Sequence, residues 1–466
     1  MALVAVATLC IGLTNTDTLP VTAPLTIALF TALGFVRALA YRGRGVVPWF
    51  ELGVIYLATV TLYLVYPLIG FLAIDQVYTA HNDGRLRSLR PDVSEVGRAA
   101  WLYVCHIVAF ALMYLLVRGR LMLSQLPLRR PTPAIFLAMA IVYILIEAFV
   151  VFLGLFFDLS SSNYAGTYLA VRRLPLVFAQ LLNHLGGVKY ALSLMLLAAL
   201  FCRYRTFKPL IATWLLVVAA ITMIRLGDRT EFVLLVMAAT MMYHAMVKPL
   251  SPGVVIMVAG TGLAGFVAFG ALRNVAGDVG RLSNFNPFMY SSEFESMFGN
   301  AVHLNRVRGA IGDLPPAFYL ADLTAVLPQQ LAPFTKIDRA DWYVTTFFPG
   351  YAAIGGGLAF GTIAEAILTG GWIAALWWGA ALGFVFAKIH RIYARHAHRF
   401  WVFVFYVWIA TLSYQAFRNT SFSHLVLFVY RFIPAVVLVN LLAIFIRRFA
   451  LANPRAEAPR VVKASL

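Results

Sequence analysis

The sequence predicts an all-α integral membrane protein: a polytopic bundle of about twelve transmembrane helices, with one large extracytoplasmic loop between the ninth and tenth spans. Three observations carry this prediction. Of the 466 residues, 62% are hydrophobic and only 12% are charged, whereas soluble domains have roughly 25% charged residues. The apolar residues fall in blocks near the ~20 residues that cross a hydrocarbon core. The alternation over about 10 residues that marks a transmembrane β-strand is absent.

The expected spans follow one another along the chain. They are residues 2–14, 20–41, 47–75, 99–117, 132–157, 184–202, 209–225, 231–247, 253–272, 371–391, 401–417 and 425–446. The first block lacks the basic n-region of a cleavable signal peptide, so it is interpreted as a span. Four regions result: an N-terminal bundle (1–272), an extracytoplasmic loop (273–370), the last spans (371–448) and a cytoplasmic tail (449–466).

The distribution of Lys and Arg predicts the orientation. The formal net charge is +18, but the basic residues occupy short connectors and form no continuous patch for nucleic acid. Alternate connectors carry them and contain no Asp or Glu: Arg42, Arg44, Arg118, Arg120, Arg129, Arg130, Arg203, Arg205, Lys208, Lys248, Lys388, Arg391, Arg395, Arg399, Arg447 and Arg448. Because positively charged loops stay in the cytoplasm, both termini are predicted to be cytoplasmic.

The segment 273–370 is far longer than the usual connection between helices. It is rich in aromatic residues, which predicts an ordered cap of short helices on the membrane surface. One helix is expected to start near Ser292, which can cap it ahead of Glu293 and Glu295. A re-entrant or half-buried helix is expected from about Leu358 to Leu368, and such backbone at membrane depth indicates a cavity. The segments 76–98 and 158–183 are interpreted as loops of moderate length.

Several arginines lie at the extracytoplasmic ends of spans, in the long loop or, in the case of Arg431, inside the last span. They are Arg225, Arg229, Arg273, Arg306, Arg418 and Arg431. A single arginine in such a position commonly extends to the lipid headgroups, and a charged turn such as Gly227–Asp228 can simply cap helix ends. Guanidinium groups that converge from separate helices bind phosphate oxygens bidentately. These arginines are therefore predicted to bind the diphosphate of a substrate at the outer leaflet.

Three residues are predicted to take part in proton transfer: Glu365, His303 and Glu295. Glu365 lies in an otherwise apolar run, where a carboxylate must be paired, solvated or protonated. Its alternative role is a structural ion pair with an arginine such as Arg273 or Arg418. His303 is the rival base, because the ordinary pKa of histidine suits proton transfer at pH 7; the alternative is a solvated helix face.

Two other carboxylates lie in or beside apolar blocks. Glu147 lies inside a span, so its carboxylate must also be paired, solvated or protonated. Glu51, at the start of a span, is expected to pair with Arg42 or Arg44. The extracytoplasmic segments contain no metal-ligand spacing, so neither a metal nor another cofactor is expected.

Two short motifs resemble one known family. The turn Gly227-Asp228-Arg229 lies between central spans, and a Gly-Gly-Gly-x-x-Phe-x-x-Ile-Ala-Glu run extends from Gly355 to Glu365. Together with the many spans and the large outer loop, they resemble the Wzy-type polymerases of bacterial O-antigen, capsule and exopolysaccharide repeat units. Many members have Gly-x-Gly-x-Ser before the Ala-Glu region. This chain has Leu358-Ala359-Phe360-Gly361 there, so a contact through serine is not carried over.

The resemblance implies an inverting, metal-independent glycosyltransferase of the GT-C-like group in the bacterial inner membrane. It implies undecaprenyl-diphosphate-linked oligosaccharides as substrates, membrane lipids as surroundings, and a chain-length regulator and a flippase as partners; nucleic acid is not among them. A hydroxyl of one lipid-linked repeat attacks the anomeric carbon of the chain on a second lipid, and undecaprenyl diphosphate leaves. Arginines would stabilise the leaving group, and a carboxylate or histidine would accept the proton.

Two alternatives share some of these features. An O-antigen ligase has a similar architecture and donor but transfers the glycan to a lipopolysaccharide core; the Gly355–Glu365 run favours the polymerase. A lipid-linked-glycan transporter is the alternative from another class, with a Gly-interrupted helix at its binding site. The absence of paired internal repeats, and the position of the charges at the outer rim, favour an enzyme.

The orientation can be tested with Ser124→Cys and Asp313→Cys, two single variants in connectors that should face opposite sides of the membrane. A membrane-impermeant thiol reagent applied to intact cells should label position 313 and leave position 124 unlabelled, because the Lys and Arg residues beside Ser124 hold it in the cytoplasm. Labelling of position 124 from outside would contradict the predicted topology.

Overall fold

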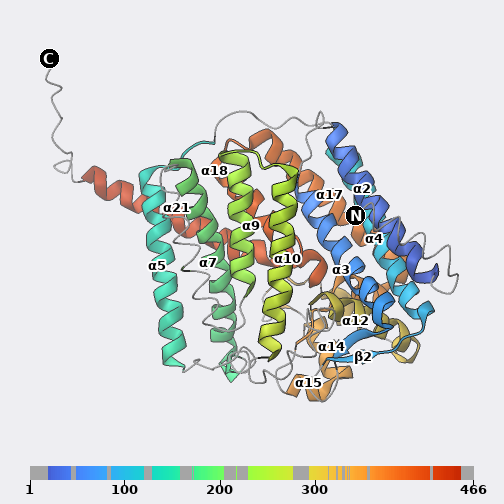
Figure 1. Cartoon of the computed structure of the whole chain (residues 1–466). Helices are drawn as coiled ribbons and strands as arrows, with labels where there is room; N and C mark the ends of the chain where they lie inside the picture. The colour runs from blue at the N-terminus through green and yellow to red at the C-terminus, as the bar shows by residue number, and fades with distance from the viewer. Residues whose placement is uncertain are drawn as a thin grey trace.

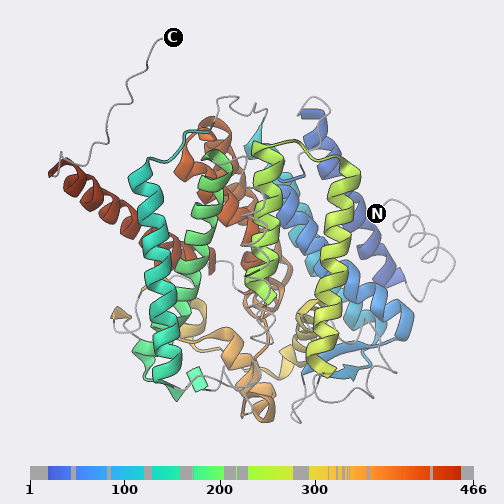
Figure 2. The same ribbon diagram turned by 60° about the vertical axis from the view of Figure 1, so that its left-hand side comes forward.

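The structure, a computed structural model, describes residues 19–42, 49–80, 86–119, 128–157, 170–171, 173–203, 217, 229–275, 293–312, 314–321, 324–327, 331–332, 334, 336–353, 357–419 and 423–452. Long apolar helices run side by side as a bundle, and short elements gather at one end of it (Figure 1). The view turned by 60° shows the same short elements across one end of the long helices (Figure 2).

In the part of the chain that the structure describes, seven helices are long and apolar enough to cross a membrane. They are α2 (Leu19–Arg42), α3 (Leu52–Ile74), α4 (Val93–Arg118), α5 (Pro133–Phe156), α7 (Leu176–Arg203), α17 (Gly371–His396) and the composite helix α20 (Ser423–Leu427), η5 (Phe428–Phe432) and α21 (Ile433–Ala452). Each coincides with a predicted span. The polytopic helical bundle is therefore confirmed.

Three further helices coincide with predicted spans: α9 (Arg229–Met246), α10 (Pro252–Val275) and α18 (Phe400–Thr411). Their apolar stretches are shorter than those of the seven long helices. The expected span 2–14 and all but one residue of 209–225 lie outside the described residues. A total of about twelve spans stays a prediction.

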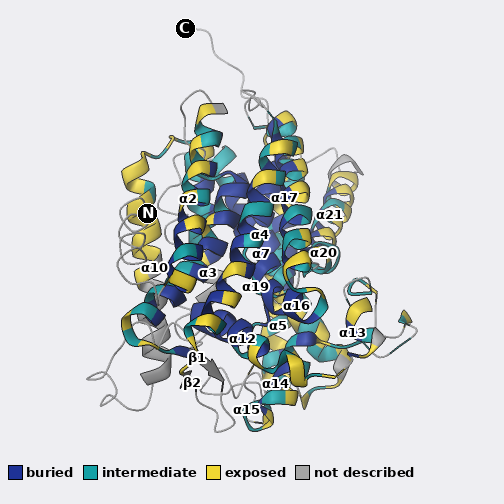
Figure 3. Ribbon diagram, turned by 90° about the vertical axis from the view of Figure 1, so that its right-hand side faces the viewer, coloured by how far each residue is buried: buried dark blue, intermediate teal, exposed yellow. Residues whose placement is uncertain are grey.

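Burial is distributed as expected for helices surrounded by lipid. Large apolar side chains face outward on the peripheral helices, with Leu155 on α5 77% exposed and Ile256 on α10 64% exposed. The second half of α7, over residues 188–199, is mostly buried, whereas α10 is exposed along much of its described length (Figure 3). In water, such a surface would be an aggregation liability; in a bilayer, it is the surface that lipid covers.

Helices α4 and α17 are in close backbone contact. A Cβ atom on Gly379 would lie 2.4 Å from the carbonyl oxygen of His106, and one on Gly383 would lie 2.6 Å from that of Phe110. Both helices advance by four residues between these contacts, so they run parallel. Two glycines four residues apart are a common device for bringing transmembrane helices into backbone contact.

The relative directions of the helices agree with the charge pattern. Glu51, at the start of α3, pairs with Arg118, at the end of α4, so these two helices are antiparallel. Helix α17 ends at His396 and α18 begins at Phe400, so α18 begins at the end of the bundle where α17 ends. The starts of α4 and α17 therefore lie at one end of the bundle and the starts of α3 and α18 at the other. The side of the membrane that each end faces stays a prediction.

The short elements form a cap at the end where α4 and α17 begin. They are the antiparallel strands β1 (Val77–Ala80) and β2 (Leu86–Leu89), and the helices α12 (Glu293–Val307), η3 (Arg308–Ala310), α13 (Pro316–Leu320), α14 (Arg339–Phe347), α15 (Pro349–Ala353) and α16 (Thr362–Thr369). The predicted helix start near Ser292 is confirmed by α12. The segment 76–98, which we interpreted as a loop, instead contains the β-hairpin and the first turn of α4.

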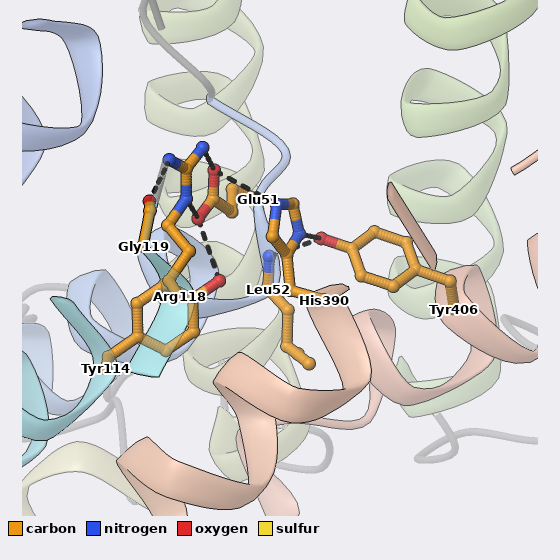
Figure 4. A network of polar contacts seen from close by, with 7 residues as sticks. All are labelled: Glu51, Leu52, Tyr114, Arg118, Gly119, His390 and Tyr406. Carbon is orange, nitrogen blue, oxygen red and sulfur yellow. Dashed lines mark hydrogen bonds and ion pairs between the residues drawn. The ribbon is translucent and has the colours of Figure 1, made fainter. Parts of the chain in front are cut away.

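A buried polar network ties the helices together at the opposite end (Figure 4). Arg118 donates through Nε to Oε1 of Glu51 at 2.7 Å and through Nη2 to Oε2 at 2.9 Å. Tyr114 donates its hydroxyl to Oε1 at 2.8 Å, and Nε2 of His390 lies 3.5 Å from Oε2. The other ring nitrogen of His390 is 2.9 Å from the Tyr406 hydroxyl, which accepts the N–H of Leu52.

The expectation that Glu51 pairs with Arg42 or Arg44 was wrong. Glu51 precedes α3 and its carboxylate faces into the bundle, where the antiparallel helix α4 brings Arg118 within reach. The side chains of Glu51 and Arg118 are only 2% and 6% exposed. A buried carboxylate needs a buried cation as its partner, and Arg118 supplies it.

Gly379→Ala should weaken the α4–α17 contact. The new methyl group would meet the backbone of α4, and overpacking of this kind typically costs about 1–3 kcal/mol. The matched control is Gly154→Ala in α5, where a Cβ meets no atom within 4 Å. In detergent, the midpoint of thermal unfolding should fall for Gly379→Ala and stay unchanged or rise for Gly154→Ala. Equal midpoints would show that the glycine contact does not hold these helices together.

Glu51→Gln should destabilise the bundle by about 3–5 kcal/mol, because it leaves Arg118 as a buried charge without its carboxylate. Glu95→Gln is the control, since Glu95 pairs with Arg306, whose side chain is 39% exposed, and exposed pairs contribute about 0.2–1 kcal/mol. Unfolding curves of both variants in one detergent measure the difference. A Glu51→Gln curve that matches the control curve would contradict the structural role of the network.

Candidate functional site

The short helix α16 is held in the centre of the capped end. Gly361, just before it, has a φ of +85°, a conformation that favours glycine. Thr362 then donates its hydroxyl to the carbonyl of Ala416 at 2.8 Å. Every residue from Thr362 to Leu368 is buried. The predicted half-buried helix is present, but it begins four residues later than Leu358, because the chain turns at Gly361.

Glu365 of α16 forms a buried ion pair with Arg339, the first residue of α14. Nη1 of Arg339 lies 3.0 Å from Oε1 of Glu365, and the two side chains are 2% and 1% exposed. Arg339 also donates through Nη2 to the carbonyl of Phe318 at 2.8 Å, and its guanidinium lies 5.0 Å from the centre of the Phe318 ring. The position of this cation is therefore fixed from three directions.

Arg339 was not among the predicted site residues. We named Arg273 and Arg418 as partners for Glu365, because they lie at the ends of spans. The partner that the structure reveals comes from the long loop, 26 residues before Glu365 in the sequence. A sequence signal was present: the segment Asp338-Arg339-Ala340-Asp341 places an arginine in the first turn of an aromatic helix. Asp338 caps that helix by accepting the N–H groups of Ala340 and Asp341.

A pocket of about 350 Å³ reaches this ion pair. It is lined by Tyr319, Arg339, Glu365, Thr369, Gly370, Ile373, Ala374, Trp377 and Trp378. Tyr319 and Trp377 are 45% and 66% exposed, so aromatic side chains line its outer part. The pocket thus combines a buried cation and carboxylate with apolar walls at the start of a membrane-spanning helix. Such a site suits a ligand with a charged head and an apolar or ring-shaped body.

His303 lies on α12, among aromatic rings. Its Nδ1 is 3.0 Å from the hydroxyl of Tyr343, and its ring packs against Phe347 and Phe348. Burial, with a smaller contribution from nearby Arg306, lowers the pKa of His303 to about 4. The expectation that His303 keeps an ordinary pKa was therefore wrong. At pH 7 the ring is neutral and is a weak base, because its conjugate acid forms only in acid.

Arg306 and Glu295, also on α12, face other elements. Arg306 makes a bidentate pair with Glu95 at the start of α4, with an Nη2–Oε2 distance of 2.6 Å. Glu295 is 4% exposed and lines a small cavity against the end of α3, beside Tyr66 and Gly70. Neither residue lines the pocket at Glu365. The α12 residues thus fix the cap onto α3 and α4.

The remaining predicted arginines have different positions. Arg225 lies outside the described residues, and the structure places Arg229 and Arg273 in α9 and α10 without describing their side chains. Arg418 ends α19 (Gln415–Arg418), which packs against α16. Arg431 lies in η5 and bonds to Asn183 of α7. The proposed convergence of these arginines on one diphosphate stays a prediction.

Two other features of the site bear on its chemistry. Arg308, the first residue of η3, has Nη2 at 3.5 Å from the carbonyl of Leu368, so a second arginine lies beside the last turn of α16. Among the residues whose positions are described, no three His, Cys, Asp or Glu side chains come together in a way that would hold a metal ion. Outside this site, Glu147 forms an ion pair with Lys189 at 3.2 Å.

The comparisons with known proteins do not identify a family for this chain, so the function has to be argued from the residues of the site. No protein-family model, no curated protein and no solved structure matches this chain at a significant level. The resemblance to Wzy-type polymerases therefore rests on the Gly227–Arg229 turn and the Gly355–Glu365 run. Since one fold can serve many functions, the chemistry has to be argued from the side chains in the pocket.

Proposed function

We propose that this protein is a glycosyltransferase that acts on lipid-linked oligosaccharides, with Glu365 and Arg339 in its reaction site. The observation that carries the proposal is the buried ion pair of these residues at the inner part of an aromatic-lined pocket. Glycosyl transfer from a diphosphate donor requires a base for the acceptor hydroxyl and a cation for the leaving group. A carboxylate and a guanidinium supply these two groups. In more detail, we propose a Wzy-type polymerase of undecaprenyl-diphosphate-linked repeat units, metal-independent and inverting.

Glu365 is the proposed general base. An acceptor hydroxyl in the pocket transfers its proton to the carboxylate while its oxygen attacks the anomeric carbon of the donor sugar. The bond between that carbon and the diphosphate oxygen breaks, and the diphosphate leaves with the electron pair. Attack from the face opposite the leaving group inverts the anomeric configuration.

Arg339 is the proposed stabiliser of the leaving group. In the resting site its charge is balanced by Glu365 at 3.0 Å. When Glu365 accepts the proton, that balancing charge disappears, and the guanidinium is left to stabilise the charge that develops on the diphosphate. Electrostatic stabilisation of this kind is strongest where water is excluded, and both side chains are almost fully buried. One proton transfer thus couples activation of the acceptor to stabilisation of the leaving group.

The pocket walls suit the rest of such a substrate. Trp377 and Trp378 lie near the start of α17, and Tyr319 faces them from α13. Tryptophan and tyrosine favour the boundary between lipid and water, where the sugar and the isoprenoid of a lipid-linked glycan meet. Their flat apolar faces also offer surfaces for sugar rings and isoprenoid chains.

Glu365 is favoured over His303 as the base. The Nδ1 of His303 already contacts the hydroxyl of Tyr343. His303 also does not line the pocket. We therefore propose a supporting role for His303 in the packing of α12 against α14.

The polymerase is favoured over the alternatives by two features. The Gly355–Glu365 run, whose last residue is the proposed base, resembles the polymerases more than the ligases. The pocket charges lie beside the start of α17 and not midway along a span, where a transporter site is expected. The polymerase proposal places the pocket at the outer leaflet of the bacterial inner membrane. It includes a chain-length regulator and a flippase as partners, and Arg229 and Arg273 as further diphosphate ligands.

Glu365→Gln keeps the shape of the side chain and removes its basicity. The rate of repeat-unit joining by purified protein in lipid should fall by about 100-fold or more, while binding of the lipid-linked donor persists. Arg339→Lys should lose most activity as well, because an ammonium lacks the planar fork that spans two oxygens. His303→Gln should have the smaller effect.

Glu95→Gln is the matched control, because it makes the same change in an Arg–Glu pair that does not line the pocket. It should polymerise at the rate of the unmodified protein. Normal polymerisation by Glu365→Gln, or an equal loss in Glu95→Gln, would contradict the assignment. Thermal unfolding of each variant separates loss of chemistry from loss of fold.

A further inference from the structure

The last apolar helix contains a charged residue at an irregular turn. Five residues, Phe428–Phe432, form the π-helical segment η5 between α20 and α21, and Arg431 lies within it. Single π-helical turns inside longer helices often mark functional sites, because the inserted residue is presented to a neighbour. A charged side chain within a membrane-spanning helix is costly and is generally retained for a function.

The side chain of Arg431 crosses onto α7. Its Nη2 donates to Oδ1 of Asn183 at 2.9 Å. One turn further along α7, a Cβ atom on Gly187 would lie only 1.9 Å from Cδ of Arg431. Any larger residue at position 187 would displace the arginine. The absence of a side chain at Gly187 therefore leaves the space for Arg431 where η5 and α7 cross.

Arg431 differs in its partners from the cations of the three ion pairs within the bundle and its cap. Arg118 and Arg339 each face a carboxylate, and Lys189 faces Glu147. Among the described residues, Arg431 has a neutral amide as its hydrogen-bond partner and no carboxylate within 4.0 Å, and its buried Nε has no acceptor. The positive charge at the crossing is left without a counter-ion from these residues.

The neighbouring aromatic side chains add no negative charge. His184 stacks on Tyr430 with ring centres 5.0 Å apart, and its buried Nδ1 has no partner in the described part of the chain. The hydroxyl of Tyr430 donates to the carbonyl of Val326 in the cap at 2.7 Å. The crossing thus lies beside the capped end, about 10 Å along α7 from its first residue. Asn183 is exposed and Arg431 is half-buried, so the site can be reached from outside the bundle.

We infer that Arg431 and Asn183 form an anion site that binds the phosphate group of a membrane lipid. A guanidinium binds two phosphate oxygens at once and stays charged at any physiological pH. The amide of Asn183 supplies a further donor, and Gly187 leaves the space in which the arginine lies. This site shares no residue with the pocket at Glu365. It does not depend on the function proposed for that pocket.

Binding of three probes to delipidated protein in detergent tests the inference. The probes are phosphatidylglycerol, undecaprenyl phosphate and inorganic pyrophosphate; the first two distinguish a phospholipid source from a polyprenyl source. Native mass spectrometry measures the bound lipid, and the midpoint of thermal unfolding is followed with each probe. At least one lipid should bind the unmodified protein, and Arg431→Gln should lower its affinity about tenfold or more, as expected for charge-assisted hydrogen bonds.

Arg431→Lys should keep part of the affinity, and Asn183→Leu should lose part of it. Arg391→Gln, which removes a half-buried arginine at the opposite end of the bundle, should bind like the unmodified protein. Without lipid, Arg431→Gln should unfold at the same temperature as the unmodified protein or above it, because no carboxylate loses a partner.

Equal lipid affinities for the unmodified protein and Arg431→Gln would overturn the inference. Failure of both lipids to bind the unmodified protein would also overturn it. Tighter binding of pyrophosphate than of either lipid would overturn the inference that the phosphate group belongs to a lipid. If Arg431→Gln does not fold, Arg431→Lys and Asn183→Leu decide the question, and affinities equal to that of the unmodified protein would then reject the site.

Discussion

The backbone contact between α4 and α17 determines where the candidate site lies. Gly379 and Gly383 allow α17 to approach the carbonyl groups of α4, which fixes the position and direction of α17. Helix α16 ends at Thr369, and α17 begins at Gly371. The start of α17 therefore anchors the end of α16, and the pocket is built from both helices. At the other end of the bundle, Glu51 and Arg118 hold α3 against α4, and His390 joins α17 to the same network.

Three of the carboxylates described within the bundle and its cap, besides Glu95, each meet a cation from another element. The pairs Glu51–Arg118, Glu147–Lys189 and Glu365–Arg339 have closest distances of 2.7, 3.2 and 3.0 Å. The surroundings of the pairs differ, and the surroundings determine which chemistry each pair can perform. Glu51 is enclosed by Tyr114, His390 and the end of α4, so that pair stabilises the fold. Glu365 and Arg339 face a pocket, so that pair can meet a substrate.

Much of the fold could be predicted from the sequence, because hydrophobic blocks and the placement of Lys and Arg are local signals. They predicted ten of the helices close to their observed positions, the helix that starts after Ser292 and the short apolar helix that contains Glu365. The β-hairpin at Val77–Leu89 was missed, because each strand has only four residues and no strong alternation. The π-helical segment at Arg431 leaves no periodic signal in a uniformly apolar stretch.

The partners within the site were harder to predict, because they depend on how distant segments pack. Nothing in the local sequence connects Arg339 to Glu365 or Arg118 to Glu51; the second pair is 67 residues apart. The low pKa of His303 follows from the rings of Phe347 and Phe348 around it, which come from another helix. Residue types therefore predicted the kinds of groups present, and packing decided which of them meet.

The central claim is that the pocket at Glu365 holds the diphosphate of a lipid-linked sugar. A structure of the protein in a lipid nanodisc, determined by electron cryo-microscopy with an undecaprenyl-diphosphate-linked oligosaccharide, would test this claim most directly. We expect diphosphate density within hydrogen-bond distance of Arg339, with the anomeric carbon of the first sugar facing Glu365. Diphosphate density elsewhere, with the Arg339–Glu365 pair intact and its pocket empty, would contradict it.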